Sequence, residues 1–228
     1  MIRLHTLERF EGQPLTTQLL LGVLQGYKRP YDKIVEWVEK GYLIQVRRGL
    51  YVPAEASGIM PPEPFLVANH LYGPSYISME SALSHWGLIP ERVYQICSAT
   101  NRISKNFNAG GLTYSFTHLP MPYYAFGIRQ VELTATQTVL MASPEKCLCD
   151  KIITTAGVQL RSKRQAMEFL VEDLRIDEDD LRNLDAAEIT GWLSNCPKVK
   201  SIMNLILRSE EHTSELQSRG LISYAVFC

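Results

Sequence analysis

Apolar residues recur at helical spacing in two short stretches near the N-terminus. In the first, Leu15–Leu24, leucine and valine side chains fall on one side of a helix, and Thr16 or Thr17 can cap its start. Gly26 follows the stretch, as is common where a helix ends. We therefore predict a helix over residues 15–24.

The second stretch begins at Pro30, a residue that suits the first turn of a helix because no N–H has to be satisfied there. Ile34, Trp37 and Val38 follow at the spacing of one helical face, and Gly41 ends the pattern. The pattern predicts a helix that packs these three side chains into a core and turns its opposite face outward.

Two β-prone runs come next, Leu43–Val46 and Leu50–Val52, and Arg47, Arg48 and Gly49 lie between them. Gly49 can adopt the positive φ that a tight hairpin turn requires. Helix, helix and a hairpin with a basic tip form the order of a winged helix-turn-helix. The sequence therefore predicts a DNA-binding domain of this kind over residues 1–53.

Residues 54–64 hold several prolines, which break regular structure, and we interpret them as a linker. Five β-prone runs separated by turn signals follow, at Val93–Ala99, Lys105–Phe107, Leu112–His118, Ile128–Leu133 and Val139–Ala142. We predict that residues 65–207 form one domain. The expected fold is α+β: an N-terminal winged helix-turn-helix followed by a small, mostly antiparallel sheet with C-terminal helices.

Helical patterns flank the β-prone runs. One covers about Phe65–Leu71, and Ser78 can cap another. Ser143, followed by a first-turn proline and acid, opens a third helix, and the pattern is helical from Lys163 onward. Asp185 stands three residues before a glutamate, which is the spacing of a capping box.

The last residues, Arg208–Cys228, resemble a translated sequencing adapter. The common adapter strand, read in one frame, matches Arg208–Ser218 and Ile222–Cys228, with a gap the size of an index tag between them. We exclude this tail from the fold prediction, as one excludes a fusion scar. We expect the natural chain to continue past Leu207.

Composition narrows the class of protein. Of the 228 residues, 46% are hydrophobic and 21% are charged, which suits a folded core. No apolar run reaches the roughly 18 residues of a membrane span, and the N-terminus lacks the apolar segment of a signal peptide. The five cysteines are scattered, as in proteins of a reducing compartment. We predict a soluble, cytoplasmic protein without a membrane partner.

Charge is unevenly distributed along the chain. The formal net charge is −1 overall, whereas residues 1–53 sum to +3, so the N-terminal end is the better match for phosphate. The helix before the hairpin can lie in the major groove, and the hairpin tip can reach the DNA backbone or the minor groove. The predicted DNA contacts are Lys28, Arg29, Tyr31, Lys33, Arg47 and Arg48.

Three acidic residues on the same predicted helix, Asp32, Glu36 and Glu39, weaken non-specific affinity for DNA and favour sequence selectivity. Winged helices also serve as docking units for other proteins. A protein-interaction adaptor is therefore the second interpretation that the sequence leaves open.

Three motifs follow one another along the chain. They are Gly41-Tyr42-Leu43 with Arg48-Gly49-Leu50-Tyr51, residues 79–90 (MESALSHWGLIP), and Ala142-Ser143-Pro144-Glu145-Lys146 with Leu148 and Asp150. Together, over about residues 15–155, they resemble the motifs of AbiEi-type antitoxins of type IV toxin–antitoxin systems. Cys147 stands where that family usually has alanine.

The resemblance implies a transcriptional repressor that binds repeats in double-stranded DNA upstream of its own operon. It also implies that the protein opposes a nucleotidyltransferase-like toxin encoded beside it. In type IV systems this opposition does not require a stable complex, so the resemblance implies no direct contact with the toxin. Nor does it fix which side chains read bases.

The sequence has no pattern typical of a catalytic or metal site. The histidines before the tail, none at metal-site spacing, are His5, His70, His85 and His118. Cys147 and Cys149 point to different faces of a predicted helix. We predict no metal, no cofactor and no enzymatic activity; a nucleic-acid-processing enzyme built on Glu132 or Glu145 is the third interpretation.

Overall fold

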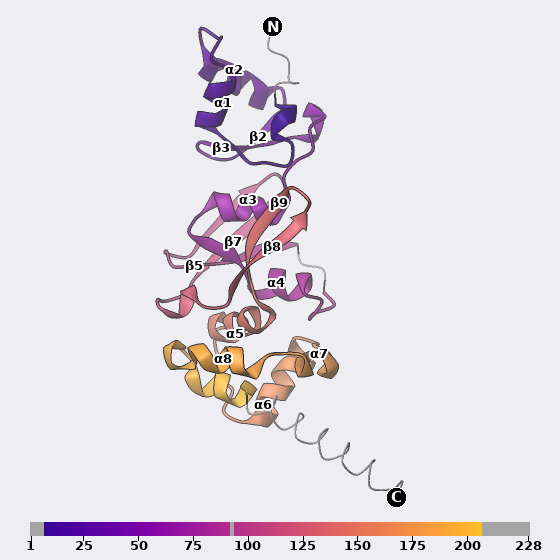
Figure 1. Ribbon diagram of the computed structural model, residues 1–228, viewed down its shortest axis with the longest axis vertical. Helices are drawn as coiled ribbons and strands as arrows, with labels where there is room; N and C mark the ends of the chain where they lie inside the picture. The colour runs from indigo at the N-terminus through magenta and orange to yellow at the C-terminus, as the bar shows by residue number, and fades with distance from the viewer. Residues whose placement is uncertain (1–6, 92–93, 207–228) are drawn as a thin grey trace, which may run out of the picture. The chain divides into compact units, whose positions relative to one another are not determined.

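The computed structural model describes residues 7–91 and 94–206, and it has a mixed α+β fold with two sheets (Figure 1). The chain divides into two compact units, each built from several segments. Of the described residues, the first unit comprises 7–77, 94–117 and 130–141, and the second comprises 78–91, 118–129 and 142–206. The α+β class predicted from the sequence is confirmed.

The N-terminal part of the first unit carries two α-helices and a three-stranded antiparallel sheet in the order β1-β3-β2. Its elements are the 3-10 helix η2 (Glu8–Phe10), β1 (Leu15–Thr16), α1 (Thr17–Val23), α2 (Pro30–Glu39), β2 (Leu43–Arg47) and β3 (Leu50–Pro53). The helix predicted over residues 15–24 begins later than expected, because its first two residues pair with β3 as strand β1.

Local interactions explain why these elements start and turn where they do. The Thr16 hydroxyl accepts a hydrogen bond from the backbone N–H of Leu19 at 3.2 Å, which caps α1 as predicted. Pro30 occupies the first turn of α2. Gly49 turns the β2–β3 hairpin with φ +84°, so the positive φ predicted for it is confirmed.

A compact apolar core supports this N-terminal part. Its buried members are Leu7, Leu15, Leu20, Val23, Leu24, Ile34, Trp37, Leu43 and Ile59. They come from both helices, from the strands and from the segment that follows the hairpin. The hairpin and α2 are therefore positioned by one shared core.

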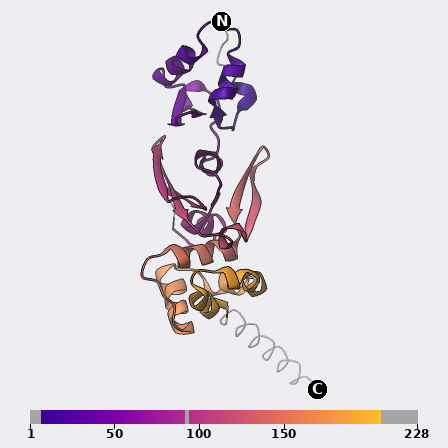
Figure 2. The ribbon, with the colours of Figure 1, turned by 90° about the vertical axis from the view of Figure 1, so that its left-hand side faces the viewer.

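The second sheet has six strands in the order β6-β7-β5-β4-β9-β8. The strands are β4 (Ser75–Ile77), β5 (Gln95–Thr100), β6 (Lys105–Ala109), β7 (Leu112–His118), β8 (Ile128–Thr134) and β9 (Gln137–Ala142). Figure 2 shows the hairpins β6–β7 and β8–β9 at opposite edges of this sheet. The sheet is mixed rather than purely antiparallel, because β4 pairs with β9 in parallel.

Two helical segments precede this sheet in the chain. The 3-10 helix η3 (Glu55–Ser57) falls within the predicted linker, and α3 (Pro64–Leu71) packs against β4 and β5. The strand predicted from Val93 onward begins at Gln95, and Val93 itself lies outside the described residues.

The second unit is mainly helical. Its elements are α4 (Met79–His85), η4 (Tyr123–Ala125), α5 (Pro144–Thr154), α6 (Lys163–Met167), the π-helix η5 (Glu168–Asp173), α7 (Glu178–Arg182), α8 (Ala186–Trp192), η6 (Leu193–Asn195) and a helix over residues 199–206. Helix α5 packs against both α4 and α8. The adapter-like tail, Arg208–Cys228, lies outside the described residues.

The predicted helix caps of this unit differ in outcome. Ser143 caps α5 by accepting a hydrogen bond from the backbone N–H of Lys146, as predicted. Ser78 holds the N-cap position of α4, as predicted, but its hydroxyl makes no capping bond and donates to Asp150 instead. Asp185 caps α8 through two backbone N–H groups.

No helix within residues 7–91 and 94–206 combines the length and the apolar character that crossing a membrane requires.

Candidate functional site

Helix α2 turns one face into the N-terminal core and the opposite face outward. Ile34 and Trp37 are each only 3% exposed, and Val38 is half-buried against the same core, as the sequence predicted. At the edge of the buried stripe, where the helix surface becomes exposed, Tyr31 is 61% exposed and Val35 is 55% exposed. Tyr31 and Val35 are one helical turn apart, so they lie side by side on the exposed surface.

The six residues predicted to contact DNA all lie in this N-terminal part. Lys28 and Arg29 are exposed in the turn before α2, and Tyr31 is exposed in its first turn. Arg47 ends β2 and Arg48 follows it in the hairpin turn; both are exposed. The structure therefore brings five of the six to the surface, on α2 and on the hairpin that packs beside it.

Lys33 is the residue that departs from the expectation. Its side chain is only 22% exposed, and its Nζ lies 2.8 Å from Glu36 Oε2. The same Nζ lies 6.0 Å from the centre of the Trp37 ring. Lys33 therefore bends along the helix toward Trp37, and it does not project outward as a free base-reading side chain.

Acidic neighbours neutralise most cations of α2. Glu36 also accepts a hydrogen bond from Lys40 Nζ at 2.6 Å, and these two lysines lower the pKa of Glu36 to about 2. Arg29 forms a looser ion pair with Asp32 at 3.6 Å. Lys28 and the hairpin residue Arg48 are exposed cations outside these pairs.

Arg47 makes one weak contact outside the hairpin. Its guanidinium donates to the backbone carbonyl of His70, at the long distance of 3.5 Å. This contact could not be predicted from local patterns, since the two residues are 23 positions apart in the chain.

Val35 is the surface residue that the sequence analysis missed. The signal was present in its spacing: Val35 lies four residues after Tyr31 and three before Val38, so the apolar stripe of α2 is wider than the three predicted core side chains. The edge of such a widened stripe lies beyond the core and reaches the surface.

A second polar cluster lies in the other unit and is fully buried. Lys146 Nζ is 2.9 Å from Asp150 Oδ1 and donates to the Tyr123 carbonyl at 3.1 Å. Asp150 also accepts hydrogen bonds from the hydroxyls of Tyr123, at 2.9 Å, and Ser78, at 2.7 Å. Burial lowers the pKa of Lys146, and the charge of Asp150 opposes that shift. Because every member of this cluster is shielded from solvent, the cluster fits a structural role.

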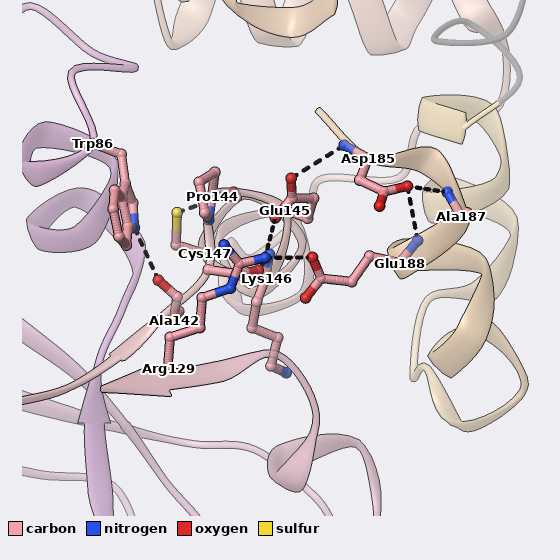
Figure 3. Close-up of polar contacts among 11 residues, drawn as sticks. Trp86, Arg129, Ala142, Pro144, Glu145, Lys146, Cys147, Asp185, Ala187 and Glu188 are labelled. Atoms are coloured by element: carbon pink, nitrogen blue, oxygen red, sulfur yellow. Dashed lines mark hydrogen bonds and ion pairs between the residues drawn. The ribbon is translucent and has the colours of Figure 1, made fainter. Parts of the chain in front are cut away.

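Glu145, on the same helix α5, belongs to a neighbouring charged group (Figure 3). Glu145 Oε1 accepts the backbone N–H of Asp185 at 3.1 Å. In a capping box Glu188 would accept this N–H, and here Glu145 accepts it instead. Figure 3 shows the Arg129 guanidinium between two carboxylates, 2.7 Å from Glu188 Oε2 and 3.8 Å from Glu145 Oε2. Burial and the nearby Glu145 raise the pKa of Glu188.

In the described part of the chain, neither a metal site nor a cavity involves the predicted DNA contacts. Within it, no group of three or more histidine, cysteine or acidic side chains could hold a metal ion. One cavity of about 800 Å³ lies along residues 159–161 and 197–204. Another, of about 390 Å³, lies in the first unit. Neither is lined by any of the six predicted DNA contacts, which form an exposed surface instead of a pocket.

Comparison with known protein families gives no match to this chain, and comparison with curated proteins gives none. The resemblance described from the sequence motifs therefore stays a prediction.

Proposed function

We propose that this protein is a cytoplasmic transcriptional repressor, without enzymatic activity, that serves as the antitoxin of a type IV toxin–antitoxin system. One observation carries the DNA-binding part of the proposal. The outer face of α2 is exposed, and cations flank it in the preceding turn and in the β2–β3 hairpin.

The element order β1–α1–α2–β2–β3 supports a winged helix-turn-helix. In that arrangement α2 would enter the major groove, which is wide enough for one helix. The hairpin would lie against the phosphate backbone, where Arg47 and Arg48 could bind. Contacts to phosphate position such a domain, and contacts from the helix select the sequence.

The salt dependence of binding tests the DNA interface. Fluorescence anisotropy with duplexes tiled across the DNA upstream of the reading frame would measure Kd at several salt concentrations. Replacing Arg47 and Arg48 with alanine removes two candidate phosphate contacts, so the slope of log K against log salt should shrink by roughly 2. An unchanged slope would contradict the role given to the hairpin.

A matched control for this double variant exists in the second unit. Arg164 and Arg175 have side chains that are 87% and 70% exposed. Replacing both with alanine removes the same formal charge from a surface that the proposal does not use. DNA affinity and its salt slope should then stay at the wild-type values.

The antitoxin part of the proposal rests on the motif resemblance and needs its own experiment. A nucleotidyltransferase-like reading frame beside this gene would be expressed with and without the protein. Growth should fail without the protein and recover with it. Toxicity that persists at equal expression of both proteins would contradict the antitoxin role, whatever the result with DNA.

A second candidate function, a protein-docking adaptor, is favoured by the ion pairs of α2. Glu36 holds both Lys33 and Lys40, and the outer face presents the apolar surface of Tyr31 and Val35. This alternative predicts no retention of upstream DNA at any salt concentration. The anisotropy experiment therefore separates the two candidates.

A further inference from the structure

We infer that Tyr31 and Val35 on α2 recognise thymine through its C5-methyl group. This inference rests on the proposed DNA-binding function and names the bases that α2 selects.

The outer face of α2 offers apolar contact. Tyr31 and Val35 are more than half exposed, while Ile34 and Trp37, on the face of the same helix that packs into the core, are each 3% exposed. The packing of Ile34 and Trp37 into the core thus fixes the rotation of α2 and leaves Tyr31 and Val35 at its surface. A single exposed apolar residue is ordinary, but two on one turn form a small patch.

The lysines of α2 are not free donors for the hydrogen-bond acceptors of guanine. Lys33 and Lys40 both bind Glu36, which would have to release them before either could reach a base. Arg29 is also paired, with Asp32 at 3.6 Å. Reading guanine through Arg or Lys would therefore require breaking pairs that are formed in the free protein.

Thymine is the base whose major-groove edge carries a methyl group, and apolar side chains recognise it there. Tyr31 and Val35 match that chemistry. The exposed cations Lys28 and Arg48 lie in the turn before α2 and in the hairpin that packs beside it, where they can attract phosphate. This charge complementarity favours DNA over an uncharged apolar partner as the occupant of the patch.

The inference can be tested by removing the methyl groups from the DNA. The probe is the upstream duplex that the wild-type protein retains, compared with the same duplex in which deoxyuridine replaces every thymidine. Wild-type affinity should fall about fourfold for each methyl group that the patch covers, the loss expected for one buried CH₂-sized group. The hydrogen-bonding edges of the bases stay the same.

Val35→Ala completes a thermodynamic cycle with this change. Alanine has higher helix propensity than valine, so α2 should stay folded. The variant should bind the thymidine duplex about as weakly as wild type binds the deoxyuridine duplex, and it should discriminate less between the two. Any general effect of uracil on duplex stiffness acts on both proteins and cancels in the cycle. Tyr31→Ala should behave in the same way.

Leu140→Ala is the matched control, because Leu140 is an exposed apolar residue on β9, with 42% of its surface exposed. It should discriminate between the two duplexes as the wild type does. Equal wild-type affinity for both duplexes, or full discrimination by Val35→Ala, overturns the inference while the proposed function stands. Failure of the wild-type protein to bind any upstream duplex overturns both.

Discussion

The two units of the chain use the same ion-pair spacing in opposite environments. In α2, Glu36 pairs with Lys40 four residues later, and the two side chains are 37% and 56% exposed. In α5, Lys146 pairs with Asp150 four residues later, and both side chains are 0% exposed. The spacing brings each pair together, but burial determines how much of the fold depends on it.

The physical difference lies in solvation. Water and salt screen the α2 pair, and exposed pairs of this kind contribute little to stability. The α5 pair has left water, so each charge depends on its partner and on the hydroxyls of Ser78 and Tyr123. We therefore expect charge removal in α5 to disturb folding and charge removal in α2 to affect mainly the surface potential.

Asp150→Asn should have the largest effect. It keeps the shape of the side chain but leaves the charge of Lys146 buried without a counter-ion, which should cost about 3–5 kcal/mol in the free energy of unfolding. Urea denaturation would measure the loss. In the double variant Lys146→Met with Asp150→Asn no uncompensated charge remains, so part of the stability should return. A loss below about 1 kcal/mol would contradict the importance of burial.

Gly127→Ala should have the next largest effect, because Gly127 lies beside the same buried lysine. Its φ is +61°, and an added Cβ would lie 2.7 Å from Cβ of Lys146 and 3.1 Å from the Trp192 ring. Strain and overpacking together should cost about 2–4 kcal/mol by urea denaturation.

Gly157→Ala separates the two causes of that loss. Gly157 has a similar φ of +76°, but an added Cβ would meet nothing within 4 Å. Its substitution should therefore cost only the conformational strain, about 1 kcal/mol. Equal losses at Gly127 and Gly157 would show that crowding around Lys146 is unimportant.

Local rules explain why much of the N-terminal part could be predicted from the sequence. Pro30 marks the start of α2, the Ile34 and Trp37 spacing gives its buried face, and Gly49 gives the hairpin turn. These features act over a few residues. Strand β1 was missed because two residues are too few to show alternation, and its pairing partner lies more than thirty residues away along the chain.

The candidate surface could be predicted only in part. The exposure of Lys28, Arg29 and Arg48 follows from their positions in turns. The side-chain direction of Lys33 does not, because its rotamer is decided by Glu36 and by the Trp37 ring.

The buried network of the second unit was not predictable from spacing. Lys146 and Asp150 look like an ordinary surface pair in the sequence, and their partner Ser78 looks like a helix cap. Contacts between residues some seventy positions apart decide both roles. Sequence patterns detect which residues share a helix face, but not which face a distant segment will cover.

Glu188→Gln should have a smaller effect that depends on pH. The pKa of Glu188 is raised, so the folded state keeps this proton to higher pH than the unfolded state. Its contribution to stability is therefore present below about pH 4.5 and is lost as pH rises through the folded pKa. At neutral pH the variant should be more stable than wild type by about 0.5 kcal/mol, because it removes repulsion from Glu145 and keeps an acceptor for Arg129.

Unfolding measured from pH 4 to pH 8 would check this prediction. The difference between variant and wild type should grow as the pH rises. Arg129→Ala should have the opposite effect and lower the stability at neutral pH, since it removes the cation that lies between the two carboxylates. A pH-independent difference for Glu188→Gln would mean that burial and the Glu145 charge do not raise the pKa of Glu188.

Glu36→Gln should have the smallest effect on stability, and it completes the comparison with Asp150→Asn because both changes replace a carboxylate with an amide of the same shape. The pKa of Glu36 is lowered to about 2, so its stabilising contribution is present above the unfolded value of 4.5 and is lost as pH falls through about 2. Because the side chains are exposed, the denaturation midpoint at about 0.15 M salt should not change measurably. The same substitution removes the negative charge that neutralises Lys33 and Lys40, so retention on upstream DNA should increase and become more sensitive to salt. A large loss of stability, comparable to that of Asp150→Asn, would contradict the argument that burial separates the two pairs.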